Sequence, residues 1–85
     1  MHVIEGMAPQ FMGLAQARVW AAADPTRPVV RVVYQDSQGR MILLDQQRVR
    51  PGQPTDGRWI VGDVALQLTG EAPAEILRNL RARVR

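Results

Sequence analysis

Few side chains in this sequence are of the types that carry catalytic or metal-binding chemistry. There is one histidine, His2, one serine, Ser37, and no cysteine. Nucleophilic catalysis needs a base beside the nucleophile, and His2 is the only candidate base, while Ser37 lies in an expected turn. A metal on His2 would need partner ligands that the sequence does not supply. We therefore predict no catalytic residue, no metal site and no cofactor, and a protein that is not an enzyme.

Two pairs of carboxylates, Asp45 with Asp63 and Asp36 with Asp56, have the residue types that general acid–base chemistry uses. Nothing in the sequence brings the members of either pair together, so we interpret them as solvated acids on loops and strand edges. A phosphate-cradling loop is not indicated either, because the glycines are isolated and no Gly-Lys-Ser/Thr sequence follows them. These glycines are Gly52, Gly57, Gly62 and Gly70.

All eleven basic residues are arginines, and the net charge is +3. Arginines crowd the C-terminal stretch, where an exposed basic helix could release counterions from a nucleic acid. A tryptophan beside a polar loop is a natural anchor of a protein interface, and Trp59 has that place in the sequence. We name Trp59, Arg78 and Arg85 as candidate partner-binding residues. A protein partner or self-association is the leading expectation, and an arginine-rich nucleic-acid-binding module is the alternative.

The length and composition are those of one small globular domain. At 85 residues, with 46% apolar and 22% charged residues, the chain is neither extremely charged nor depleted in core formers. No apolar run approaches the roughly 20 residues of a membrane span. The absence of cysteine is compatible with an oxidising or a reducing compartment. We expect a single domain over residues 1–85.

The stretch 28–49 predicts a long β-hairpin. Its first arm is rich in valine and ends in Tyr34, and its second arm begins Met-Ile-Leu-Leu, which suits a half-buried pleated surface. Between the arms, Asp36 can bond nearby backbone N–H groups, and Gly39 can take a positive φ. Both faces of the hairpin begin apolar near the turn and become polar towards Gln46 and Arg48. We therefore expect one face to be wetter at that end.

The remaining elements are less uniform. Residues 1–12 are expected to be irregular or to form a short edge strand around Val3 and Ile4, and residues 13–22 fit either a strand or a helix, with strand preferred. A polar surface loop over 50–57 precedes an extended segment at 59–61, a tight turn at 62–63 and an alternating strand from Val64 to Thr69. A C-terminal helix over 72–84 follows, with Pro73 in its first turn.

The apolar stripe of this helix is wide enough to cover a sheet, and it consists of Ile76, Leu77, Leu80 and Val84. Arg78 and Arg85 are expected to point away from it. The pattern predicts an α+β fold, in which a small antiparallel β-sheet of four to five strands, arranged as a meander, is covered on one face by a single C-terminal helix.

From Val29 onwards, the order of elements resembles the small C-terminal extracytoplasmic domain of bacterial anti-sigma factors and related membrane-anchored regulatory proteins. The resemblance implies a non-enzymatic regulatory or sensory protein-interaction domain, acting in signalling and transcription regulation and lying outside the cytoplasm; without it, the cytoplasm is the expected location. The chain departs from that family in having no membrane span and no His-Cys-Cys zinc segment, so sigma-factor binding is not assigned to any residue. The match is carried by Tyr34, Gly39, Trp59, Leu66, Leu68, Gly70, Glu75, Leu77 and Leu80.

Overall fold

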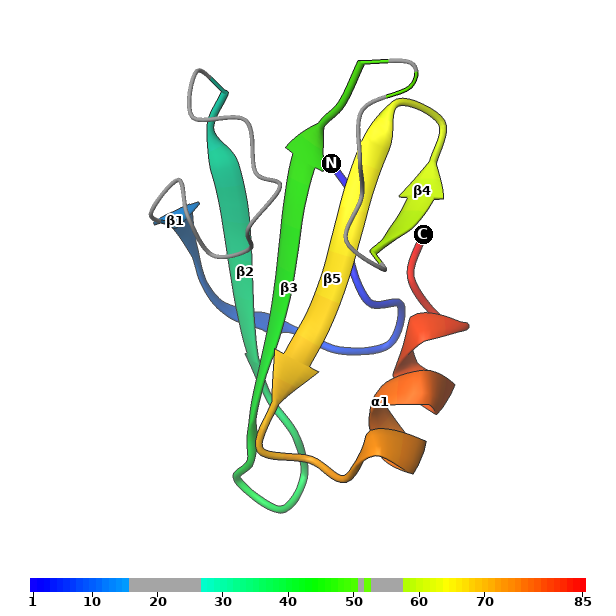
Figure 1. Cartoon of the computed structure of the whole chain (residues 1–85). Helices are drawn as coiled ribbons and strands as arrows, with labels where there is room; N and C mark the ends of the chain where they lie inside the picture. The colour runs from blue at the N-terminus through cyan, green and yellow to red at the C-terminus, as the bar shows by residue number, and fades with distance from the viewer. Residues whose placement is uncertain (16–26, 51, 53–57) are drawn as a thin grey trace.

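The computed structural model describes residues 1–15, 27–50, 52 and 58–85. These residues form one five-stranded antiparallel sheet in the order β1-β2-β3-β5-β4, followed by a single helix that lies beside β5 (Figure 1). This architecture confirms the predicted α+β class. The elements are β1 (Pro9–Ala15), β2 (Val29–Gln35), β3 (Met41–Arg48), β4 (Trp59–Val61), β5 (Val64–Gly70) and α1 (Ala74–Arg81).

The β2–β3 hairpin forms as predicted, and its turn uses the chemistry read from the sequence. The Asp36 carboxylate accepts hydrogen bonds from the backbone N–H groups of Gln38 and Arg40, each at 2.9 Å. Gly39 takes a φ of +77°, and its N–H donates to the Asp36 carbonyl. A tight turn followed by a left-handed glycine is a common way to close a three-residue hairpin loop. The pairing of Tyr34 with Ile42 then sets the register of both arms.

The strand order departs from a simple meander at one step, because β5 and not β4 lies next to β3. The seven residues of β5 pair with β3 from Arg48–Val64 to Ile42–Gly70. The three residues of β4 can form only a short ladder, and they occupy the edge beyond β5. A long partner satisfies more backbone groups of β3 than a short one, which accounts for this order.

The core lies between the sheet and α1. We call the sheet face towards α1 the helix side and the opposite face the far side. Leu80 is the buried residue of α1, and Ile76 and Leu77 are half-buried against the same cluster. The buried cluster consists of Ile4, Val32, Tyr34, Ile42, Leu44, Leu66, Ala72 and Leu80.

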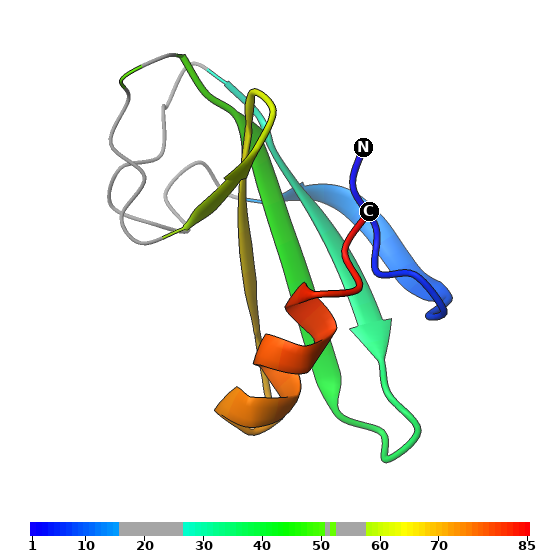
Figure 2. The ribbon, with the colours of Figure 1, turned by 90° about the vertical axis from the view of Figure 1, so that its right-hand side faces the viewer.

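The helix is shorter than predicted. It spans Ala74–Arg81, with Pro73 as its N-cap residue, so the expectation of a helix over 72–84 was too long at both ends. Val84 leaves the helix and pairs with Ile4 in an isolated antiparallel bridge. The two ends of the chain therefore lie side by side (Figure 2). Since β-bridge geometry satisfies backbone groups at both termini, tertiary pairing outweighs the helical spacing of Val84.

The prediction of a wetter end of β3 was wrong. Asp45, Gln46 and Gln47 are all nearly inaccessible to solvent, at 2%, 5% and 2% exposure. Each has hydrogen-bond partners that offset the cost of burial. Gln46 accepts from the N–H of His2 and donates to its carbonyl, both at 2.8 Å, so its amide binds the N-terminal backbone at two points. Gln47 donates to the Arg27 carbonyl at 3.0 Å.

The outcomes for the N-terminal region are mixed. Residues 1–8 are irregular apart from the bridge at Ile4, and the edge strand begins at Pro9. The strand interpretation of 13–22 is confirmed for Gly13–Ala15, and the rest of that segment lies outside the described residues. Of the loop expected over 50–57, the structure describes 50 and 52 alone.

Candidate functional site

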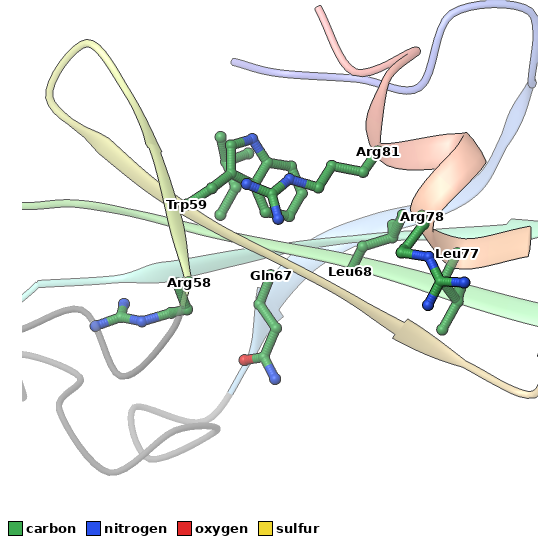
Figure 3. A pocket seen from close by; sticks show the side chains of 8 residues that line it. Arg58, Trp59, Gln67, Leu68, Leu77, Arg78 and Arg81 are labelled. Atoms are coloured by element: carbon green, nitrogen blue, oxygen red, sulfur yellow. The ribbon is translucent and has the colours of Figure 1, made fainter. Parts of the chain in front are cut away.

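A small cavity of about 210 Å³ lies where β4, β5 and α1 meet (Figure 3). It forms because the pairing of β4 with β5 begins at Trp59 and Leu66. The residues of β5 after Leu66 have no partner in β4. Side chains of β5 and α1 surround the cavity there. The lining residues are Arg58, Trp59, Leu66, Gln67, Leu68, Leu77, Arg78 and Arg81.

Trp59 and Arg81 form one wall of the cavity. The Arg81 guanidinium carbon lies 4.5 Å from the centre of the Trp59 ring, so the two groups stack (Figure 3). Such a cation–π contact contributes about 0.5–1 kcal/mol at an exposed site and more where water is excluded. Trp59 is half-buried and also packs against the core cluster. The Trp59 ring therefore has a fixed position, and the stacking fixes the position of the Arg81 guanidinium.

Arg78 lies one helical turn before Arg81 and borders the same cavity. Residues three apart on a helix share a face, which explains why both reach it. Leu68 of β5 and Leu77 of α1 supply the apolar part of the lining (Figure 3). Within the described residues, neither Arg78 nor Arg81 has a carboxylate partner. The cavity is therefore a cationic site with an apolar floor.

Arg58, which precedes β4, and Gln67 of β5 extend away from the stacked pair (Figure 3). The Oε1 atom of Gln67 is buried and accepts no hydrogen bond from the residues that the structure describes. A buried acceptor without a donor is costly, at roughly 1–3 kcal/mol. A ligand that brings an N–H or O–H group to this edge would remove that cost.

Four other arginines among the described residues are each paired with a carboxylate. The side-chain hydrogen bond to Asp45 raises the pKa of Arg31, and the hydrogen bond from Arg48 lowers the pKa of Asp63. Because these charges are balanced locally, they add little to an attractive field for an anionic partner. The ion pairs are Arg31–Asp45, Arg40–Asp36, Arg48–Asp63 and Arg85–Glu5.

The structure brings together two of the three candidate residues named from the sequence. Trp59 and Arg78 line the same cavity. Arg85 does not: its Nε lies 2.9 Å from a carboxylate oxygen of Glu5, and its Nη1 donates to the Ala82 carbonyl. Arg81 was missed as a site residue, although its spacing from Arg78 was visible. Its stacking on the tryptophan depends on how β4 meets the helix, which no local pattern reports.

A second and larger cavity, of about 570 Å³, lies at the C-terminal end of β3. Its polar lining is already engaged: Gln46 binds the N-terminal backbone, Gln47 donates to the Arg27 carbonyl, and Arg48 pairs with Asp63. Groups that are satisfied internally have little to offer a ligand. We therefore take the Trp59–Arg78–Arg81 cavity as the candidate site.

Among the described residues, no group of three or more histidine, aspartate or glutamate side chains is placed to hold a metal ion. In the same part of the chain, no helix has both the length and the apolar character that crossing a bilayer requires. Comparison with known proteins found no matching family model, no matching curated protein and no matching solved structure.

Proposed function

We propose that this domain is a non-enzymatic protein-interaction module that binds an acidic segment of a partner protein at the Trp59–Arg78–Arg81 cavity. The observation that carries the proposal is the pair of arginines, Arg78 and Arg81, that border an apolar cavity without a carboxylate partner among the described residues. One of them is held in place by stacking on Trp59. Fixed guanidinium groups lose less entropy when they bind an anion than free ones do.

The volume of the cavity favours a side chain over a small-molecule ligand. Pockets for cofactors and drug-sized ligands measure about 300–1,000 Å³, whereas this cavity measures about 210 Å³. An aspartate or glutamate side chain could accept paired hydrogen bonds from an arginine. An apolar neighbour on the same peptide could contact Leu68 and Leu77. The expected ligand is therefore a short segment that combines acidic and apolar residues.

The distribution of charge supports a protein over a nucleic acid. A nucleic-acid site needs a continuous row of uncompensated cations along the phosphate backbone. Here Arg31, Arg40 and Arg48 are paired with carboxylates, and the candidate cavity has one aromatic ring in its lining. The regulatory and sensory role, of the kind that anti-sigma factors fill outside the cytoplasm, stays a prediction that rests on the sequence resemblance.

Titration by NMR tests the proposal. The probe is a synthetic pentapeptide of alternating glutamate and leucine, added to the ¹⁵N-labelled chain, and the same peptide with glutamine in place of glutamate is the control. We expect the Trp59 indole signal and the Arg81 side-chain signal to shift when the acidic peptide is added and not when the glutamine peptide is added. Arg78→Gln and Arg81→Gln should each weaken binding by about tenfold, as the loss of one charged hydrogen bond predicts.

Arg48→Gln is the matched control, since it removes the same charge from an exposed residue that does not line the cavity. If it weakens peptide binding as much as Arg78→Gln does, the attraction is a net-charge effect and the proposed site is wrong. A single-stranded oligonucleotide is titrated in parallel over a salt series. Tight binding that falls steeply with salt, together with no response to the acidic peptide, would favour the nucleic-acid alternative instead.

A further inference from the structure

The strand β1 forms an unusually apolar edge of the sheet. Its residues Pro9–Ala15 carry no charge, and three large side chains are exposed: Phe11 at 62%, Met12 at 47% and Leu14 at 76%. Natural edge strands are normally short, charged or covered, because an open edge pairs with other strands. The opposite edge, β4, has three residues. Of the two edges of the described sheet, the edge of β1 is therefore the better suited to pairing.

The hydrogen-bond pattern shows which backbone groups are open. The Asp36 N–H donates to the Arg40 carbonyl, so 36 and 40 form a hydrogen-bonded pair. Such pairs alternate along an antiparallel ladder. It follows that Val30 and Val32 point their backbone groups towards β3, whereas 29, 31 and 33 point theirs towards β1.

The same alternation continues into β1. Phe11, Gly13 and Ala15 are opposite 33, 31 and 29, so their backbone groups face β2. The N–H and C=O groups of Met12 and Leu14 consequently face away from the sheet. Pro9 lies before the register shift in this ladder, and the residue that lacks an N–H is therefore outside the regular part of the edge.

We propose that a second copy of this chain pairs with this edge, antiparallel, about a two-fold axis at Gly13. In that register Met12 lies opposite Leu14 of the second copy, and the two residues exchange both of their outward N–H···O=C bonds. The two-fold axis repeats the same exchange on the other side, and an isologous contact closes as a dimer. The sheets of the two copies become one continuous ten-stranded sheet, twice the five strands of each copy.

Gly13 suits the axis for a steric reason. The Phe11 ring lies across it, since a Cβ on Gly13 would be 2.9 Å from two ring atoms. At the axis, Gly13 meets its counterpart in a pair without hydrogen bonds, where opposing Cα atoms approach to about 4.5 Å. Two glycines leave room for the two Phe11 rings, which cover the bare backbone on the far side.

The chemistry of the strand selects a second copy as the occupant. Each chain carries a net charge of +3, yet no charged residue lies between Pro9 and Ala15, so two copies meet without like charges at the contact. The apolar side chains of Met12 and Leu14 each meet an apolar side chain. Each copy contributes a stretch of one seven-residue edge strand to this contact, so we expect weak association, with a dissociation constant in the micromolar range.

Sedimentation velocity over a concentration series tests the dimer. The unaltered chain should change from monomer to dimer between low micromolar and millimolar concentration. Met12→Lys and Leu14→Lys place a charge in the apolar contact and should each raise the dissociation constant about tenfold or more. The matched control is Ile60→Lys, because Ile60 is 43% exposed on β4 at the opposite edge. It should leave the dimer unchanged.

Amide exchange in the unaltered chain gives a second measurement that does not depend on variants folding. Protection of the Met12 and Leu14 amides should rise with protein concentration, while that of Ile60 should not. A monomer at every concentration would overturn the proposal. So would a dimer that Ile60→Lys breaks and Met12→Lys leaves intact. Because β1 and the Trp59 cavity lie at opposite edges of the sheet, either result leaves the peptide-binding proposal to its own test.

Discussion

The hydroxyl of Tyr34 connects the central sheet to the N-terminal segment, and Tyr34→Phe tests what that connection contributes. The hydroxyl oxygen accepts a hydrogen bond from the Ile4 backbone N–H at 2.9 Å, and both residues are almost fully buried, at 0% and 1% exposure. Phenylalanine keeps the packing of the ring and removes only the acceptor. The Ile4 N–H is then left buried without a partner.

An unsatisfied buried donor costs roughly 1–3 kcal/mol. We therefore expect Tyr34→Phe to lower the free energy of unfolding by about 2 kcal/mol. In a domain of this size, each kcal/mol lowers the Tm by about 4–8 °C, so the Tm should fall by about 8–16 °C. The N-terminal segment around Ile4 should also lose protection locally, because the backbone pairing of Val3 with Arg85 adjoins the same contact.

Urea unfolding measures the global loss, and amide hydrogen exchange at Ile4 and Val3 measures the local one. Gln35→Ala is the matched control, since Gln35 donates one hydrogen bond, to the Gly39 carbonyl, at the exposed end of the same strand. Its removal should cost less than about 0.5 kcal/mol. Equal costs for the two substitutions, or unchanged exchange at Ile4, would refute the reasoning that burial sets the value of this bond.

Three further predictions concern the hairpin, the ion pair and a close contact. The backbone N–H of Arg40 holds the pKa of Asp36 below its ordinary value, so the Asp36 carboxylate stabilises the fold above the unfolded pKa of about 3.9. That stability is lost as the pH falls through the lower, folded pKa; Asp36→Asn should flatten the acid limb of a stability–pH profile, and an unchanged limb would contradict this assignment. Asp45→Asn should cost about 2 kcal/mol in urea unfolding, because it leaves the partly exposed Arg31 guanidinium without its charged partner, whereas the double variant with apolar residues at both positions should recover most of the loss. Gly70→Ala would put a Cβ against the Met41 carbonyl oxygen and should cost about 3 kcal/mol. Gly62 also has a positive φ, but a Cβ there meets no atom within 4 Å, so Gly62→Ala should cost about 1 kcal/mol, and equal costs would show that the contact at Gly70 relaxes freely.

The sequence predictions were correct where a structure depends on neighbouring residues, and they were wrong where it depends on contacts between residues far apart in the chain. The β2–β3 hairpin was predictable because Asp36 and Gly39 act within their own turn. The end of the helix was not, because Val84 has helical spacing from Leu80 but pairs with a residue at the other end of the chain. The same applies to Gln46. Its polar side chain suggested a solvent-facing position, but its amide is buried and donates a hydrogen bond to the His2 carbonyl.

The candidate site shows the same division. Trp59 and Arg78 could be named separately, as an aromatic anchor and a free cation. Arg85 was named for the same reason as Arg78. Because the helix ends at Arg81, however, Arg85 lies outside it and pairs with Glu5. The importance of Arg81 became visible only in the position of its guanidinium over the ring of Trp59.

The sequence by itself determined the strands β2 to β5, the central turn and the apolar stripe of the helix. These depend on propensities and spacings within a few residues, and they indicate an antiparallel sheet with one covering helix. Only the tertiary structure decided that β5 takes the place beside β3, that the two chain ends pair with each other, and that two arginines and a tryptophan line one cavity. The physical reason is that these contacts join residues far apart in the chain. Their choice depends on how many backbone groups and apolar surfaces the whole fold can satisfy at once.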